Sequence, residues 1–170
     1  MKWLLTFVLL VTASIVYAQK NIPVTEQFSI EGKVKKPFSF SLKDTKGYAT
    51  VSLDSIGITN HLRERKGVIK NVKGILLKDV LEKAEFDAPN PKVLSEYYIE
   101  CVAADGYKVV FSWNELFNSS VGQGVLIITE KDGQKGEQIP DRICIISSAD
   151  HATGRRFVKG LQKVIIKQVN

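Results

Sequence analysis

Residues that bind metals or act as catalytic bases and nucleophiles are scarce in this sequence: its 170 residues include two histidines, two cysteines and one methionine. These counts exclude zinc fingers, iron–sulfur centres with several cysteine ligands, and small disulfide-rich proteins. Glycine (12) and proline (5) are too few for collagen or a low-complexity chain. With 44% hydrophobic and 25% charged residues, the composition is that of a globular protein, and the length predicts one domain.

Several common catalytic motifs are also missing. The sequence has no Gly-x-Ser-x-Gly, no His-Glu-x-x-His, no phosphate-binding P-loop and no Gly-x-Gly-x-x-Gly. A serine or cysteine hydrolase would have to use His61 or His151, because the chain has no other imidazole. Hydrolases and nucleotide-binding enzymes are therefore disfavoured.

The first 18 residues have the pattern of a signal peptide. Met1-Lys2-Trp3 provides a short positively charged start, residues 4–16 are mostly apolar, and Val16-Tyr17-Ala18 is a small-x-small cleavage site. A retained membrane anchor is disfavoured, because the apolar run is shorter than the ~20 residues that span a bilayer. We therefore expect a general secretory signal, cleavage after Ala18, an extracytoplasmic location (periplasmic or secreted) and no stable membrane insertion afterwards.

The remaining chain has mainly the patterns of β-strands. Residues 19–27 lack periodicity and contain Pro23, so we expect a flexible leader before a domain of residues 28–170. Residues 54–73 are less regular than the segments on either side. Alternating or continuous apolar residues predict strands near 28–34, 38–42, 49–53, 97–103, 108–111, 125–129, 142–147 and 161–169.

Helical signals are short and few. A capping box at 112–115 predicts a short helix through Phe117. Strands outnumber helices, so the predicted fold is α+β: a single domain with a mostly antiparallel or mixed β core and short helices. The other helix, of about three turns, is predicted from one apolar stripe formed by Leu76, Leu77, Val80, Leu81 and Ala84.

Two segments concentrate the polar residues that recognise ligands. Residues 55–63 and 150–159 each combine a histidine with arginine and with small residues that let the backbone approach a ligand. Arg155, Arg156 and Lys159 offer a planar fork and a point charge to a phosphate or a carboxylate. The alternative, that these are solvated loop charges, stays open from the sequence alone.

Charge and cysteine content limit the partners. The formal net charge is +6, but lysine and arginine are dispersed and the chain has an export signal, so a nucleic acid is not expected as a partner. A small anionic ligand or a protein remains. Cys101 and Cys144 both lie in predicted strands, and export would permit a disulfide between them. Two buried free thiols are the alternative.

The order of features from Phe28 onward resembles the oxidoreductase molybdopterin-binding domain family, which has the sulfite-oxidase-like fold. The matching pieces occur in the family's order and together extend over most of residues 28–169. They are Ile30-Glu31-Gly32-Lys33-Val34-Lys35-Lys36-Pro37-Phe38-Ser39-Phe40-Ser41-Leu42, Val72-Lys73-Gly74-Ile75-Leu76-Leu77-Lys78-Asp79-Val80-Leu81, Ala103-Ala104-Asp105-Gly106-Tyr107 and Arg156-Phe157-Val158-Lys159-Gly160-Leu161.

The resemblance implies a cofactor cleft and a changed metal ligand. In the family, a cysteine after the third strand binds molybdenum as a thiolate; here Ser55 stands at that place, as the former metal-ligand position. The leader also lacks the twin-arginine pair typical of exported members that carry their cofactor. The cleft residues that the resemblance implies are Asn60, His61, Arg63, Asp105, Tyr107, Arg155, Arg156 and Lys159.

These observations favour one function and leave a second open. The favoured one is an exported, degenerate domain that binds a ligand or acts as an accessory protein without catalysis and without a cofactor. The other is a molybdopterin-dependent oxidoreductase whose metal is held without a protein thiolate, with His61 and Arg63 near the pterin and Tyr107 toward the substrate. Whether the protein is an enzyme is therefore undecided at this level.

Overall fold

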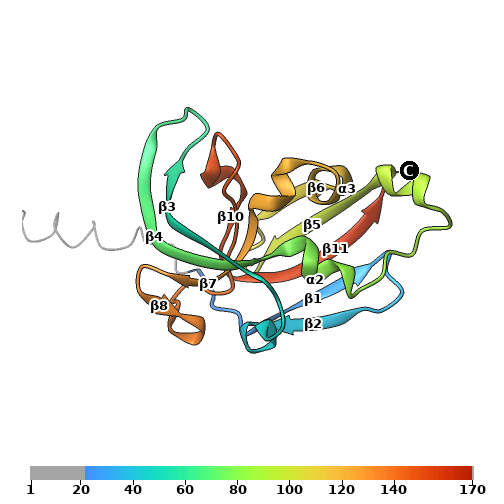
Figure 1. Cartoon of the computed structure of the whole chain (residues 1–170), viewed down its shortest axis with the longest axis horizontal. Helices are drawn as coiled ribbons and strands as arrows, with labels where there is room; N and C mark the ends of the chain where they lie inside the picture. The colour runs from blue at the N-terminus through green and yellow to red at the C-terminus, as the bar shows by residue number, and fades with distance from the viewer. Residues whose placement is uncertain (1–21, 170) are drawn as a thin grey trace, which may run out of the picture.

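The protein is described by a computed structural model over residues 22–169, and two β-sheets form most of it (Figure 1). The predicted signal peptide, residues 1–18, lies outside the described residues. Residues 25–27, predicted to belong to a flexible leader, contact the domain instead. The Thr25 amide donates to the Arg142 carbonyl at 2.8 Å, and the first strand begins at Gln27.

The first sheet has five strands and is mixed. Only β1 and β11 run parallel; the other neighbours pair antiparallel. The last strand of the chain thus lies in the middle of this sheet, between the first and the fifth. The strand order is β2 (Phe38–Ser41), β1 (Gln27–Gly32), β11 (Leu161–Gln168), β5 (Tyr97–Ala103) and β6 (Lys108–Ser112).

The second sheet is antiparallel and contains the longest strands. β3 and β4 form a curved hairpin whose tip rises away from the rest of the molecule (Figure 1). The order is β10 (Phe157–Val158), β9 (Ile145–Ser147), β7 (Val125–Lys131), β4 (Arg65–Leu76) and β3 (Thr50–Thr59), with β8 (Gln134–Lys135) paired to β7.

The prediction that residues 54–73 are less regular was wrong, because most of them belong to this hairpin. The alternation of inward side chains changes by one residue along each strand. On β3, Val51 and Leu53 pack on the same cluster as Ile56 and Ile58. On β4 the change falls at Asn71, which has a positive φ of 49°. A period-two pattern therefore fails at this point although the strands continue.

The helices are short, as predicted, but the first is shorter than its apolar stripe. Leu77, Val80, Leu81 and Ala84 are all fully buried, yet the helix α2 ends before Ala84. The carbonyls of Ala84 and Glu85 instead accept hydrogen bonds from the amides of residues 35 and 36. The helical elements are α2 (Leu77–Glu82), α3 (Trp113–Phe117), η2 (Leu42–Thr45), η3 (Pro91–Glu96), η4 (Ser120–Gly124), η5 (Gly136–Gln138) and η6 (Thr153–Arg156).

The core has two parts, one on each face of the second sheet. Val125 and Ile127 face the main core between the two sheets, whereas Leu126 and Ile128 pack in a second cluster on the opposite face. A strand buried on both faces needs a continuous apolar run, which is what residues 125–128 provide. Across residues 22–169, no helix is long and apolar enough to cross a lipid bilayer. The predicted α+β class with a mixed β core is confirmed.

Candidate functional site

The two polar segments found in the sequence lie side by side. Thr59, the last residue of β3, and Thr153, the first of η6, are linked by reciprocal hydrogen bonds: each backbone amide donates to the other hydroxyl, at 3.0 and 3.1 Å. The Thr153 hydroxyl also donates to the Gly57 carbonyl at 2.6 Å. These bonds hold residues 150–156 against β3, and this segment forms one wall of a cleft.

Gly154 permits this close approach. A Cβ at this position would lie 2.7 Å from the Thr59 carbonyl oxygen, a distance that side chains do not tolerate. The backbone of η6 can therefore touch the edge of β3 only because residue 154 has no side chain. This contact between β3 and η6, called the seam below, depends on features that both segments share: a threonine whose hydroxyl bonds to the backbone, and a glycine.

On each side of the seam there is a depression, and the two together are here called the β3 cleft. The inner depression measures about 530 Å³ and includes Ser55, exposed on β3, and Asp150. The outer depression measures about 440 Å³. The inner one is lined by Leu53, Ser55, Ile56, Gly57, Thr59, Ser148, Asp150, His151 and Thr153, and the outer one by Ile58, Thr59, Asn60, His61, Lys66, Gly154 and Arg155.

The outer depression is positively charged. Arg155 is exposed, and none of the ion pairs among residues 22–169 includes it. Lys66 lies opposite and contacts Glu64 at 2.9 Å, with both side chains about half exposed. His61 is the third basic side chain, and no Asp or Glu of the described part of the chain lines this depression. Such a setting favours an anion.

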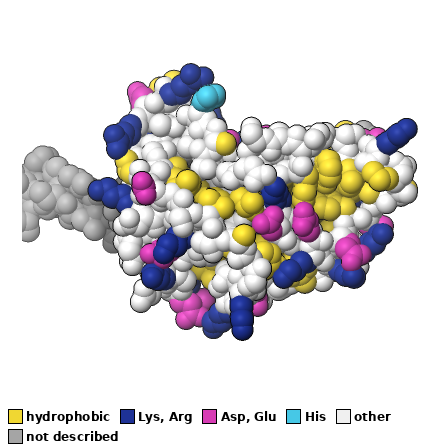
Figure 2. All heavy atoms as spheres, viewed as in Figure 1, with side chains coloured by type: hydrophobic (Ala, Val, Ile, Leu, Met, Phe, Trp, Pro, Cys, Tyr) yellow, Lys and Arg dark blue, Asp and Glu magenta, His cyan; other side chains and the backbone are white. Residues whose placement is uncertain are grey.

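Asn60 organises the hairpin tip beside the cleft. Its side-chain oxygen accepts from the amides of Leu62 and Glu64, at 2.9 and 3.0 Å. Its side-chain nitrogen donates to the Glu64 carboxylate at 2.9 Å. The polar atoms of the Asn60 side chain are thus used in hydrogen bonds within the turn. Arg63, another predicted cleft residue, has a positive φ of 62° at the tip and lines neither depression. Lysine, arginine and histidine side chains gather at this tip (Figure 2).

Arg156, predicted to contact a ligand, is instead bound to protein carboxylates. Its Nε and Nη2 donate to Asp150 at 2.7 and 2.6 Å, and its Nη1 donates to Glu115 at 2.8 Å. Its guanidinium also lies 4.3 Å from the centre of the Phe111 ring. Hydrogen bonds and charge from both carboxylates raise the pKa of Arg156. This arginine therefore supports the cleft wall from behind and does not line the cleft.

Asp150 is charged in this environment. Burial by itself raises the pKa of Asp150, but hydrogen bonds from Arg156 and Ser147 and the positive charge of Arg156 outweigh it, and the net pKa is lowered. The inner depression therefore has one fixed negative charge that is already neutralised by Arg156.

The other predicted residues lie outside the cleft. Lys159 binds Asp141 at 2.8 Å, and Asp141 also binds the buried Lys131 at 2.5 Å. Tyr107 donates its hydroxyl to the Arg155 carbonyl at 2.5 Å, so it supports the cleft from the β5–β6 turn. Asp105 accepts from the Tyr107 amide at 3.0 Å within that turn. The structure thus brings together Ser55, Asn60, His61 and Arg155, but not Arg63, Asp105, Tyr107, Arg156 or Lys159.

The two cysteines are free and buried, and neither is placed to bind a metal in the cleft. Cys101 belongs to the main core and Cys144 to the second cluster, on opposite faces of the second sheet, so no disulfide forms between them. Burial raises the pKa of each thiol to about 12. Neither thiol lines the β3 cleft.

The cleft therefore does not fit a molybdenum centre that needs a protein thiolate. Ser55, which the resemblance predicts at the former metal-ligand position, lines the inner depression, and a serine hydroxyl is not ionised near neutral pH. Among residues 22–169, no group of three or more His, Cys, Asp or Glu side chains is arranged to hold a metal ion. The cations of the outer depression fit a phosphate-bearing ligand better than a metal.

Sequence reasoning missed several cleft residues. Lys66, Thr59 and Ser148 carried no motif, and their roles depend on the pairing of β3 with β4 and on the position of the 148–156 segment. The signal that could have found Thr59 and Thr153 is their place in the two polar segments, where each lies two residues from a histidine.

Comparisons with known proteins support the fold and leave the family open. No known protein family and no curated protein matches this sequence. Among solved structures, the crystal structure of the sulfane dehydrogenase SoxCD from Paracoccus pantotrophus is similar, with a TM-score of 0.61 and 14% sequence identity. The match includes 88% of this chain but 41% of that one, so this chain spans about two fifths of its neighbour. At this identity the likeness concerns the fold alone, and the chain has a sulfite-oxidase-like fold.

Proposed function

We propose that this chain is an exported, non-catalytic ligand-binding or accessory protein, and that its β3 cleft binds a small anionic molecule. The observation that carries the proposal is the outer depression. Arg155 is exposed and in no ion pair among the described residues, Lys66 and His61 accompany it, and no acidic side chain lines the space.

The absence of catalysis is supported by the chemistry of the cleft. Ser55, which the resemblance predicts in place of the family's metal-binding cysteine, lines the cleft, and both thiols are buried in the two core clusters. Asp150 is paired with Arg156, so it is poorly placed to exchange protons near neutral pH. Binding and orientation are the tasks that these side chains can perform without further groups.

A second function rests on the same basic side chains. Arg155, Lys66 and His61 suit the phosphate of a molybdopterin, which would supply redox chemistry to an oxidoreductase that holds its metal without a protein thiolate. The fold likeness to sulfane dehydrogenase is compatible with this alternative. The two functions differ in the metal content of the native protein.

Titration with phenyl phosphate tests the proposal, with sodium chloride at equal ionic strength as the reference. At ten times its Kd, the anion should stabilise the fold by about 1.4 kcal/mol, measured as a rise in Tm. Arg155→Ala should weaken binding roughly tenfold, because among residues 22–169 Arg155 is the one lysine or arginine that lines the outer depression without an ion pair.

Arg63→Ala is the matched control, since it removes an arginine that lies at the hairpin tip and outside the cleft. Its affinity for phenyl phosphate should equal that of the unmodified chain. Equal losses in both variants would indicate attraction to net charge only, and unchanged binding in Arg155→Ala would remove this residue from the site.

A further inference from the structure

A second cavity lies away from the β3 cleft, between α2, the segment that leads to η3, and α3. It measures about 440 Å³, within the roughly 300–1,000 Å³ typical of small-molecule sites. Hydrophobic side chains gather over α3 and η3 on the face shown in Figure 2. This aromatic groove, as it is called below, is lined by Glu82, Glu85, Phe86, Ala88, Pro89, Asn90, Pro91, Leu94, Trp113 and Phe117.

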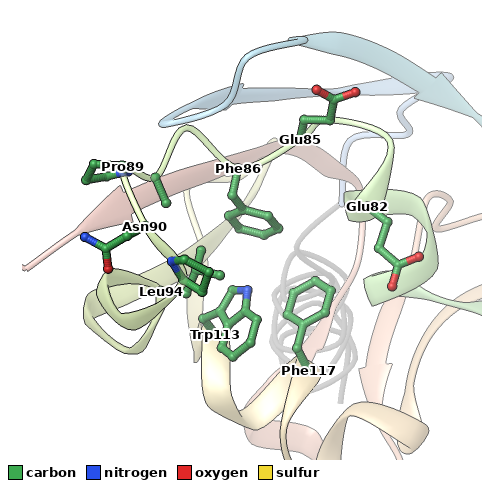
Figure 3. Close-up of a pocket in the computed structure, with 10 residues that line it drawn as sticks. Glu82, Glu85, Phe86, Pro89, Asn90, Leu94, Trp113 and Phe117 are labelled. Carbon is green, nitrogen blue, oxygen red and sulfur yellow. The ribbon is translucent and has the colours of Figure 1, made fainter.

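Three aromatic rings form the floor of the aromatic groove (Figure 3). Trp113 and Phe117 stack at 5.2 Å with an angle of 18° between their planes. Phe86 meets Phe117 edge-on, at 5.4 Å and 89°. All three side chains are partly buried against the main core, and each keeps part of its surface open to the groove.

Local structure fixes these rings before any ligand arrives. Trp113 and Phe117 lie one turn apart on α3, whose start is held by the reciprocal bonds of Ser112 and Glu115. Pro89 and Pro91 stiffen the opposite wall, because proline fixes its own φ angle. A site that is already ordered loses little conformational entropy on binding.

The charge of the aromatic groove is negative. Among residues 22–169, Glu82 and Glu85 are its only charged lining residues, and no lysine or arginine lines it. Glu85 is paired with Lys36, and in Figure 3 its carboxylate points away from the rings. Glu82 is in none of the ion pairs among residues 22–169, and it stands at the rim on the side of Phe117.

We infer that the aromatic groove is a second binding site, for a small organic cation with an apolar or aromatic body. The faces of aromatic rings attract cations, and the unpaired carboxylate of Glu82 adds to that attraction. The apolar body would cover the rings together with Leu94 and the prolines. This preference is opposite to that of the β3 cleft, so the site goes beyond the function proposed above.

Benzyltrimethylammonium is a suitable probe, and Trp113 is the reporter. The chain has only two tryptophans, Trp3 and Trp113, so the full chain with Trp3→Phe emits from the aromatic groove alone. The cation should change this fluorescence in a saturable way, and calorimetry should return the same Kd. Neopentylbenzene, its neutral isostere, and phenylacetate, an anion, should each bind roughly tenfold more weakly or worse.

Glu82→Gln should weaken the affinity for benzyltrimethylammonium roughly fivefold and leave the affinity for neopentylbenzene unchanged. Asp54→Asn is the control, because it removes one exposed carboxylate on β3, outside the aromatic groove. It should leave the Kd unchanged. The inference is overturned if the cation does not bind saturably, if the neutral or anionic probe binds as tightly, or if Glu82→Gln binds the cation as well as its parent does. Calorimetry on Trp113→Phe provides a further test, since loss of the larger ring should weaken the affinity for benzyltrimethylammonium.

Discussion

Arg156 and Asp150 form a two-point ion pair at the wall of the β3 cleft, with nitrogen–oxygen distances of 2.7 and 2.6 Å. The pair joins η6 to the loop that follows β9, and a third bond from Arg156 reaches Glu115 on α3. The next residue toward the N-terminus, Arg155, is exposed and lines the cleft. Two adjacent arginines thus differ in their contacts: Arg156 holds the wall, and Arg155 lines the cleft.

Replacing Arg156 should therefore cost stability, whereas replacing Arg155 should not. Arg156→Ala leaves the carboxylates of Asp150 and Glu115 without their partner, and we expect a loss of about 2–3 kcal/mol in the free energy of unfolding. Urea unfolding followed by circular dichroism measures it. Arg155→Ala, an exposed substitution, should stay within about 0.5 kcal/mol of the unmodified protein. Equal stability of the two variants would contradict the assigned tasks.

The same ion pair predicts how stability depends on pH. The folded-state pKa of Asp150 is lowered, below the unfolded value of roughly 3.9, so the unfolded chain binds the proton more readily. The contribution of Asp150 is therefore complete above the unfolded pKa and is lost as the pH falls through the folded pKa. Asp141 acts in the same direction. Burial raises its pKa, but hydrogen bonds and positive charge from Lys131 and Lys159 outweigh burial, and the net pKa is lowered.

We expect the free energy of unfolding to fall steadily below about pH 4. Asp150→Asn should make this decline shallower, because the side chain that takes up the proton is gone. Unfolding in urea at a series of pH values provides the comparison. An unchanged slope in Asp150→Asn would mean that other carboxylates account for the acid sensitivity.

The seam between Thr59 and Thr153 should couple stability to binding. Thr153 is buried, and Thr153→Val keeps its shape but removes the hydroxyl that accepts from the Thr59 amide and donates to Gly57. We expect a cost of about 1–3 kcal/mol and a weaker affinity for phenyl phosphate, since Arg155 lies two residues further along η6. Phenyl phosphate affinity unaffected by the substitution would show that the seam does not position Arg155.

The cysteines should be inert in the folded protein. Both thiols are buried, and their pKa of about 12 leaves almost no thiolate near neutral pH. Ellman's reagent should report no accessible thiol under native conditions and both thiols in guanidinium chloride. A reducing agent should leave Tm unchanged. Fewer than two thiols in the denatured chain would reveal a disulfide and contradict the placement of Cys101 and Cys144 in separate clusters.

Much of the fold follows from the sequence, because most strands keep a simple pattern. The predicted strand at 97–103 has the observed bounds of β5, and the capping box at 112–115 starts α3. β3 was only partly predicted. Its inward residues change from Val51 and Leu53 to Ile56 and Ile58, opposite a residue of β4 with positive φ, and such a change looks like the end of a strand.

The cleft was less predictable than the fold. The sequence identified both polar segments, and the hydrogen bonds between Thr59 and Thr153 bring them together. It could not separate Arg155 from Arg156, because only the folded chain shows which of the two binds Asp150 and Glu115. Lys66 was missed for a similar reason, since it comes near Arg155 only when β4 returns alongside β3.

The most direct test of the central claim is elemental analysis for molybdenum and tungsten, with a pterin fluorescence assay, on the protein isolated from the cells that naturally produce it. A ligand-binding protein with Ser55 in place of a thiolate should contain neither metal nor pterin in stoichiometric amounts. Stoichiometric metal and pterin would contradict this account and establish an oxidoreductase that holds its cofactor without a cysteine.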